Sequence, residues 1–223
     1  MRRSPEGSDR EDRRGHGARL PGVEIDTGSG RARVELDNPG KPTFLLVLTH
    51  GAGGGVDSPD LLAARAAGRE LGGAVARVLQ PYRVRGARAP GSPERQDAAW
   101  LEIVGALRRT LPAIPLVQGG RSNGARVACR TAQAAGARAV VALAFPLHPP
   151  GRPERSRAGE LRGAGTDVLV VNGAQDPFGI PASADASRVV VLPGETHTLS
   201  KHAESVGQAV GSWLREVLGL GAD

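Results

Sequence analysis

The segment TFLLVLTHG, residues 43–51, is the feature that most restricts how this chain can fold. Its apolar residues lack the alternation of a strand with one face in water, so the pattern predicts a strand covered on both faces. Such strands are typical of parallel sheets, in which helical connections cover both faces. The rest of the chain should therefore supply further apolar strands and the helices between them.

Strand-like and helix-like segments do alternate along the chain. The helix at 58–71 is expected to begin with a capping Ser58, and the helix at 123–136 to end at Gly136. Strands are predicted at 31–36, 43–51, 74–82, 114–120, 139–145, 167–173 and 187–194, and helices at 58–71, 93–111, 123–136 and 203–220. This order predicts an α/β fold with a mostly parallel central sheet covered by helices on both faces. The Pro-rich connection 146–166 is too short for a large cap domain.

The 223 residues suffice for one domain with a core of its own. Residues 1–22 mix Arg, Asp, Glu, Gly and Pro with almost nothing to bury. We expect these residues to form a disordered tail and residues 23–223 to form one domain.

Several sequence features indicate the cellular compartment in which the protein is expected. No apolar run approaches the ~20 residues that a membrane span needs. The N-terminal segment lacks the apolar stretch of a signal peptide. The single cysteine, Cys129, cannot form an internal disulfide, which suits a reducing compartment. We therefore expect a cytoplasmic protein that does not engage membranes.

The formal net charge of +6 raises the possibility of nucleic-acid binding. Arginine supplies nearly all the positive charge, since Lys41 and Lys201 are the lysines of the chain. The arginines are scattered among acidic residues, and aromatic residues are only 3%, which leaves few side chains for stacking on bases. We expect no nucleic-acid partner.

The pentapeptide GRSNG, residues 120–124, fits the pattern G-x-S-x-G between a predicted strand and a predicted helix. A nucleophile on such a sharp turn has a strained backbone, and Gly120 and Gly124 would relieve the crowding around it. The following helix points its positive end at the place where an oxyanion would develop. Alternatively, Ser122 is a serine in a glycine-rich turn. A phosphate loop is a poorer reading, because the G-K-[ST] ending is missing.

A second glycine-rich loop, THGAGGG at 49–55, follows the strongest strand. A dinucleotide fingerprint would need glycine where Val56 stands. The better interpretation is an oxyanion hole formed by the backbone N–H groups of Ala52 and Asn123. His50 is predicted to hold this loop rather than to act in catalysis, and it is also a candidate for the wall of a substrate pocket.

Two further loops supply an acid and a base. Asp176 lies just beyond the strand at 167–173, where Pro177 favours an extended conformation for it. His197 lies between the last predicted strand and the last helix. In a parallel sheet the loops at the carboxyl ends of the strands meet at one edge. The predicted catalytic residues are therefore Ser122, Asp176 and His197, in the chain order expected for a Ser-Asp-His site on such a sheet.

The remaining polar residues near these loops are weaker candidates. His202 is the second choice for the base, and Asp185 and Glu195 are lesser choices for the acid. His148 and Arg121 are candidates for lining the substrate pocket. Cys129 lies inside a predicted helix, where burial is expected rather than reactivity. No metal-ligand cluster is visible, and no metal or organic cofactor is expected.

The motifs LTHGAGGG, GGRSNGARVA, FPLHPPGRPE, NGAQDPFG and GETHTL, which span residues 43–200, resemble those of the α/β-hydrolase superfamily. Within it, the chain is similar to the small capless branch related to dienelactone hydrolases. It is also similar to predicted hydrolases named after a testis-expressed protein and a subunit of a histone acetyltransferase complex. The resemblance implies Ser122 as nucleophile, His197 as base and Asp176 as orienting acid. Asn123 stands where that family often has an apolar residue.

The residues and the resemblance together predict a serine hydrolase that cleaves an ester or related acyl bond. With no large cap, the site should be open and suited to a small or polar substrate. Arg152 and Arg155 lie near the expected mouth. Attraction of an anionic substrate is one interpretation of these arginines, and a solvated loop is the simpler one. The alternative function is a non-catalytic interaction module that retains the hydrolase fold, because some relatives serve as scaffolds in larger assemblies.

Overall fold

The computed structural model describes residues 22–111 and 113–221. The disordered tail predicted for residues 1–22 lies outside the described residues except for Gly22. The strands are β1 (Val23–Thr27), β2 (Gly30–Asp37), β3 (Leu45–Thr49), β4 (Ala74–Leu79), β5 (Leu116–Arg121), β6 (Ala139–Leu143), β7 (Asp167–Gly173) and β8 (Arg188–Leu192). The helices are α1 (Pro59–Glu70), α2 (Pro81–Val84), α3 (Pro93–Thr110), α4 (Asn123–Ala135), α5 (Ala158–Arg162) and α6 (Ala203–Leu218), with a 3-10 turn at Ser183–Asp185.

The strands form one eight-stranded sheet in the order β1-β2-β4-β3-β5-β6-β7-β8. The strands from β4 to β8 pair in parallel, whereas β1 and β2 pair antiparallel at one edge. The mostly parallel α/β fold predicted from the sequence is therefore confirmed. β1 is an edge strand that was not among the predicted strands, because its five residues are mostly exposed and include no run of apolar residues.

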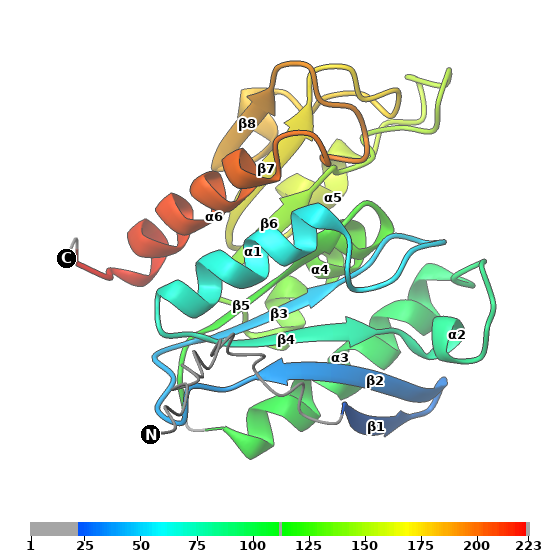
Figure 1. Cartoon of the computed structure of the whole chain (residues 1–223). Helices are drawn as coiled ribbons and strands as arrows, with labels where there is room; N and C mark the ends of the chain where they lie inside the picture. The colour runs from blue at the N-terminus through cyan, green and yellow to red at the C-terminus, as the bar shows by residue number, and fades with distance from the viewer. Residues whose placement is uncertain (1–21, 112, 222–223) are drawn as a thin grey trace, which may run out of the picture.

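Helices cover both faces of the sheet (Figure 1). α1 and α6 pack together on one face, where Leu46, Leu48 and Leu143 meet Trp213 and Leu214 in one core cluster. On the other face α3 and α4 cover the opposite side of the same strands, and α5 packs beside α4. The fully buried strands β3 and β6 explain the apolar runs that the sequence presents without alternation.

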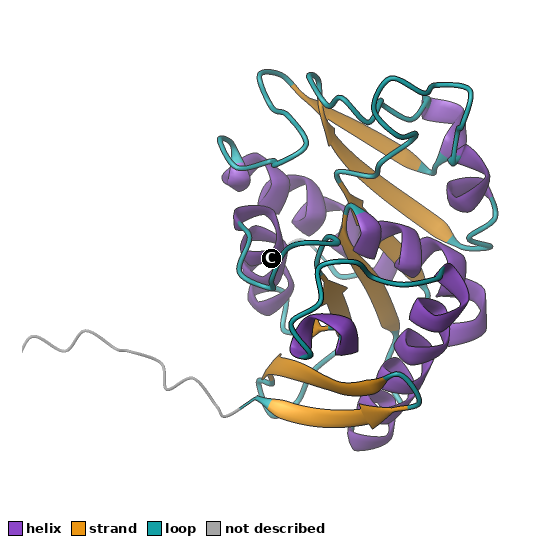
Figure 2. Ribbon diagram, turned by 90° about the vertical axis from the view of Figure 1, so that its right-hand side faces the viewer, coloured by secondary structure: helices purple, strands orange, loops and turns teal. Residues whose placement is uncertain are grey.

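Two details of the predicted connections differ from expectation. Ser58 occupies the N-cap position of α1, but its buried hydroxyl has no hydrogen-bond partner in the described part of the chain, so Pro59 starts this helix without a side-chain cap. The connection 146–166 contains the short helix α5, which is not among the predicted helices. This connection adds no cap over the sheet. Figure 2 shows loops along the edge where the parallel strands of the sheet end, with helices on both sides of the sheet. Helix α4 ends at Gly136 in a left-handed conformation, as predicted.

The end of β7 and the segment that follows β8 touch through their backbones. A Cβ atom at Gly173 would lie 2.4 Å from the carbonyl oxygen of Glu195 and 2.5 Å from that of Thr196. Backbone cannot yield as a flexible side chain can, so glycine is required at this position. This contact brings the loop after β7 and the loop before α6 to the same edge of the sheet.

Replacing Gly173 with alanine should therefore lower the free energy of unfolding by about 2 kcal/mol or more, because overpacking forces the two backbones apart. Urea denaturation measures this loss. Gly105→Ala is the matched control, since a Cβ there meets only the end of a flexible arginine and alanine favours a helix. Equal stabilities of the Gly173→Ala and wild-type chains would contradict the contact.

Candidate active site

Ser122 stands at the sharp turn between β5 and α4. Its φ of 52° is in the left-handed region, which non-glycine residues rarely adopt. The turn packs tightly against the end of β3. A Cβ at Gly120 would lie 2.6 Å from the carbonyl oxygen of Thr49, and one at Gly124 would lie 2.7 Å from that of His50. The two glycines thus permit the turn, mainly because they leave room for β3.

The side chains of Ser122, His197 and Asp176 form a continuous chain of hydrogen bonds. His197 Nε2 lies 2.9 Å from Ser122 Oγ, and His197 Nδ1 lies 2.9 Å from Asp176 Oδ2. Since the carboxylate can only accept, Nδ1 carries the proton in this arrangement and Nε2 is free to accept from the serine hydroxyl. The Asp176 side chain is fully buried and that of His197 is 18% exposed. The structure thus brings together the three residues that the sequence predicted as catalytic.

A buried amide and the following turn hold Asp176 in place. Its Oδ1 accepts from the backbone N–H of Phe178 at 2.9 Å, and its Oδ2 is 3.4 Å from Asn172 Nδ2. Asn172 is fully buried and also exchanges hydrogen bonds with both backbone groups of Phe145 at the end of β6. Asn172 therefore fixes the loop that carries the acid to the neighbouring strand.

The imidazole and the backbone of His197 have separate supports. The ring of Phe178 lies against the imidazole, with 4.2 Å between the ring centroids. Arg121 Nη2 donates to the carbonyl oxygen of His197 at 2.7 Å, and Arg121 Nε donates to Asp60 Oδ2 at 2.8 Å. Asp60 belongs to the first turn of α1 and is fully buried. The guanidinium of Arg121 thus joins α1 to the loop of His197, and its role in lining a substrate pocket stays a prediction.

Side-chain hydrogen bonds hold the two segments that carry Ala52 and Asn123, the residues predicted for an oxyanion hole. Asn123 is the first residue of α4, so its backbone N–H lies beyond the reach of intrahelical carbonyls. The Asn123 side chain donates to Gln96 Oε1 at 2.7 Å. The Tyr82 hydroxyl donates to the carbonyl oxygen of Ala52 at 3.0 Å. Both segments are thus anchored to the region around α2 and α3.

His50 is entirely buried, so its prediction as a pocket residue is wrong and its prediction as a structural residue is confirmed. Its Nδ1–H donates to the carbonyl oxygen of Gly51 at 2.8 Å, and its Nε2 accepts from the backbone N–H of Gln80 at 3.0 Å. Burial, assisted by the charge of Arg83, lowers the pKa of His50 to about 4. His50 therefore joins the ends of β3 and β4 as a neutral imidazole.

The weaker candidates occupy supporting positions. His148 packs against Gly179, beside the loop of Asp176, and its Nδ1 bonds the carbonyl oxygen of Pro149 at 2.9 Å, so its pocket role stays a prediction. The side chain of Glu195 is buried and accepts from the backbone N–H of His202 at 2.5 Å, where α6 begins. Asp185 accepts from the backbone N–H of Ala182.

Cys129 is buried in α4, as predicted. Burial raises the pKa of its thiol, which keeps the sulfur uncharged.

Several supporting residues were missed in the sequence analysis. Asn172 lies inside the apolar strand β7, where a single uncharged amide does not by itself indicate a supporting role. Asp60 and Tyr82 occupy the first turns of helices that follow the strands β3 and β4, a position that could have suggested a role at this edge. Their partners are 61 and 30 residues away, so no local pattern identifies the pairs.

In the described ranges 22–111 and 113–221, the structure has neither a metal-ligand cluster nor a helix suited to crossing a membrane. No group of three or more His, Cys, Asp or Glu there could hold a metal ion. Among the helices of the same ranges, none combines the length and apolar character of a membrane-spanning segment.

The fold and this site define an α/β-hydrolase without a cap domain. The chain belongs to the alpha/beta hydrolase domain family, whose model matches residues 42–205. A comparison with curated proteins found no match.

Solved structures share the fold at low sequence identity. XC6422 from Xanthomonas campestris, described as an α/β serine hydrolase without a lid, is 20% identical with a TM-score of 0.73, covering 90% of this chain and 96% of its own. Est1E from Butyrivibrio proteoclasticus is 19% identical with a TM-score of 0.72, covering 90% and 100%. Dienelactone hydrolase from Anabaena variabilis is 18% identical with a TM-score of 0.66, covering 87% and 96%. These likenesses establish the capless fold.

The buried imidazole of His50 predicts a specific sensitivity to acid. Its pKa is about 4 in the folded chain against an ordinary value of 6.5, so between these values only the unfolded chain takes up the proton. Its contribution to stability is complete above pH 6.5 and is lost as the pH falls toward 4. His50→Gln should abolish about 2 kcal/mol of the stability difference between pH 7.5 and pH 4.5.

Urea denaturation of both chains at the two pH values measures this difference. His202→Gln is the control, because His202 is exposed and its variant should keep the wild-type difference. An unchanged difference in His50→Gln would show that this histidine is not the source.

Proposed function

We propose that the protein is a serine hydrolase that cleaves an ester or related acyl bond through an acyl-enzyme. The observation that carries this proposal is the unbroken hydrogen-bond chain from Ser122 through His197 to Asp176, at the carboxyl edge of the sheet. Ser122 in addition has the strained turn of a nucleophile elbow, for which a merely structural serine has no need. The membership of the alpha/beta hydrolase domain family and the esterases among its structural neighbours support a hydrolase.

In the first half of the reaction, His197 Nε2 takes the proton of Ser122 as Oγ attacks the carbonyl carbon of the substrate. Asp176 holds the imidazole in the tautomer observed and stabilises the imidazolium. The backbone N–H groups of Ala52 and Asn123 bind the developing oxyanion, and each such donor contributes roughly 3–4 kcal/mol in comparable sites. His197 then gives its proton to the leaving alkoxide, which departs as the alcohol.

In the second half, His197 takes a proton from water, whose oxygen attacks the carbonyl carbon of the acyl-enzyme. Collapse of the tetrahedral intermediate breaks the bond to Ser122 Oγ, which recovers its proton from His197. The products are the carboxylic acid and the regenerated hydroxyl. Every proton in this cycle passes through the residues described, so the chemistry requires no cofactor.

Substrates that are small or polar suit a site with no cap domain, because a long apolar chain would have little surface to cover it. We propose such substrates and a reducing, cytoplasmic compartment, in keeping with the free and buried thiol of Cys129.

Replacing Ser122 with alanine should abolish labelling by a fluorophosphonate and lower kcat/KM for 4-nitrophenyl acetate by at least about 1,000-fold, because Ser122 supplies the oxygen that forms the acyl-enzyme. Gel fluorescence and release of nitrophenol measure the two effects. Ser200→Ala, at an exposed hydroxyl on the same edge, is the control and should retain both. A wild-type chain without Ser122-dependent labelling or ester cleavage would favour the non-catalytic interaction module.

Replacing Arg121 with lysine should lower kcat about 10-fold with little change in KM. Lysine keeps the positive charge beside Asp60 but cannot serve Asp60 and the His197 carbonyl in the same fixed geometry. Arg126→Lys is the control, because Arg126 makes a comparable two-bond ion pair with Glu160, which joins α4 to α5. Equal kcat losses in the two variants would assign Arg121 a role in stability alone.

A further inference from the structure

A cavity of about 330 Å³ lies beside the candidate site. Its wall comes from three places: the turn between β1 and β2, the segment around α2, and the loop 87–91 with the first turns of α3. Tyr82 and Gln96 are part of the wall. The volume is at the lower end for small-molecule sites, so it suits a compact group rather than a long chain.

Two hydrogen bonds connect this cavity to the parts of the site that would bind a reacting carbonyl. Gln96 accepts from the side chain of Asn123, which directly follows Ser122. Tyr82 donates to the carbonyl oxygen of Ala52 on the other oxyanion loop. Burial raises the pKa of Tyr82 to about 12, so this donor persists at neutral pH. Two residues of the cavity wall, Gln96 and Tyr82, therefore contact the nucleophile turn and the oxyanion loop directly.

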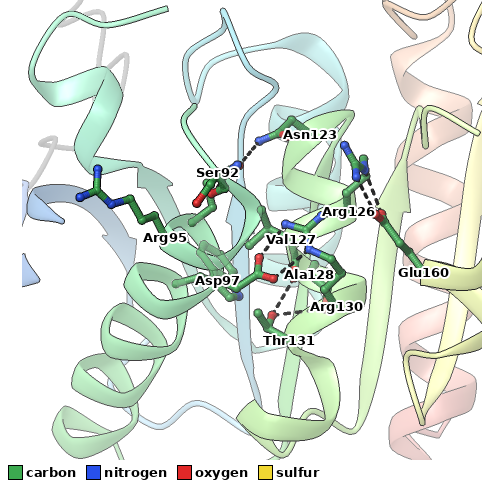
Figure 3. A network of polar contacts seen from close by, with 12 residues as sticks. Ser92, Arg95, Asp97, Asn123, Arg126, Val127, Ala128, Arg130, Thr131 and Glu160 are labelled. Atoms are coloured by element: carbon green, nitrogen blue, oxygen red, sulfur yellow. Dashed lines mark hydrogen bonds and ion pairs between the residues drawn. The ribbon is translucent and has the colours of Figure 1, made fainter. Parts of the chain in front are cut away.

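The charged side chains that line the cavity are all positive. Among the described residues that line the cavity, Arg85 and Arg95 are the charged ones, and no carboxylate is present. Arg85 donates to the carbonyl oxygen of Ser29 through one nitrogen, which leaves further N–H groups of the guanidinium for a ligand. The guanidinium of Arg95 has no partner among the described residues, and Figure 3 shows it pointing away from the polar network on α4.

The neighbouring carboxylates of α3 are outside the wall. Asp97 forms a two-bond ion pair with Arg130, and Glu102 accepts from the backbone N–H of Gly28 at 2.9 Å. Glu94 in the first turn is exposed, and hydrogen bonds from its own backbone N–H and from the Ser92 side chain lower its pKa. The carboxylates near Arg95 therefore have hydrogen-bond partners of their own, and the guanidinium of Arg95 remains available to bind an anion.

We propose that this cavity receives an anionic group of the substrate, a carboxylate or phosphate, and that Arg95 and Arg85 bind it. The inference rests on the proposed hydrolase function and names its substrate class: acyl esters that carry a negative charge a short distance from the scissile bond. A planar guanidinium offers paired N–H donors that match the oxygens of either anion. An anion held there would position the ester carbonyl toward Ser122.

The first experiment measures binding to the Ser122→Ala chain, which cannot turn the ligand over. The probes are 4-acetoxybenzoate, 4-acetoxyphenyl phosphate and the neutral methyl 4-acetoxybenzoate, titrated by calorimetry. We expect at least one anionic ester to bind about 10-fold or more tightly than the neutral ester, and the tighter of the two identifies the anion. Adding Arg95→Gln to this chain should weaken that ester about 5- to 20-fold and leave the neutral ester unchanged.

Matched variants separate the local effect from net charge. Arg85→Gln should weaken the same ester, whereas Arg138→Gln, at an exposed arginine before β6 at the other end of the sheet, should not. Equal binding of charged and neutral esters, or parallel losses for all three arginine variants, would overturn the proposal.

The second experiment measures kcat/KM for the same esters with the Ser122-containing chain. The Arg95→Gln change should lower kcat/KM for the preferred anionic ester about 5- to 20-fold, chiefly through KM, and leave the neutral ester unchanged. Binding without any cleavage would refute the proposed hydrolase function and keep the anion site. Cleavage with equal preference for charged and neutral esters would support the hydrolase function and refute the anion site.

Discussion

The packing of the turn between β5 and α4 against the end of β3 is the contact on which the candidate site depends. Ser122 has a left-handed backbone, which costs on the order of 1–3 kcal/mol for a residue other than glycine. That conformation persists because Gly120 and Gly124 lie directly on the backbone of Thr49 and His50, where no side chain fits. The same packing sets the start of α4 beside the β3–α1 loop, so the nucleophile and the proposed oxyanion donors are positioned together.

Buried polar groups then bring the acid and base to that turn. The carboxylate of Asp176 and the amide of Asn172 are removed from water, which costs free energy unless each oxygen and N–H finds a partner. Apart from the His197 imidazole and each other, their partners are backbone groups of neighbouring segments, so satisfying them also fixes the loop geometry. The buried pair of Asp60 and Arg121 acts similarly, because it can be formed only when α1, β5 and the loop of His197 are correctly placed.

Most of the fold and the three residues Ser122, Asp176 and His197 could be predicted from the sequence, and the reason is physical. Buried parallel strands and amphipathic helices carry strong local patterns, and Ser122, Asp176 and His197 each follow such a strand. Features that depend on distant partners carry no local pattern. The exposed strand β1 has no apolar run, and the inward direction of Arg121 follows from Asp60 across 61 residues. The burial of His50 likewise depends on β4, which its own loop sequence does not reveal.

The absence of a cap domain bears on how such a site could select its substrate. A cap excludes water and contributes apolar contact area, so an open site must obtain orientation from fewer and stronger contacts. Charge-assisted hydrogen bonds are the strongest of these, and a planar guanidinium can form two of them with one anion. A cationic cavity joined to both oxyanion loops through Gln96 and Tyr82 would meet that requirement. In this fold, selection by charge would then replace enclosure by a lid.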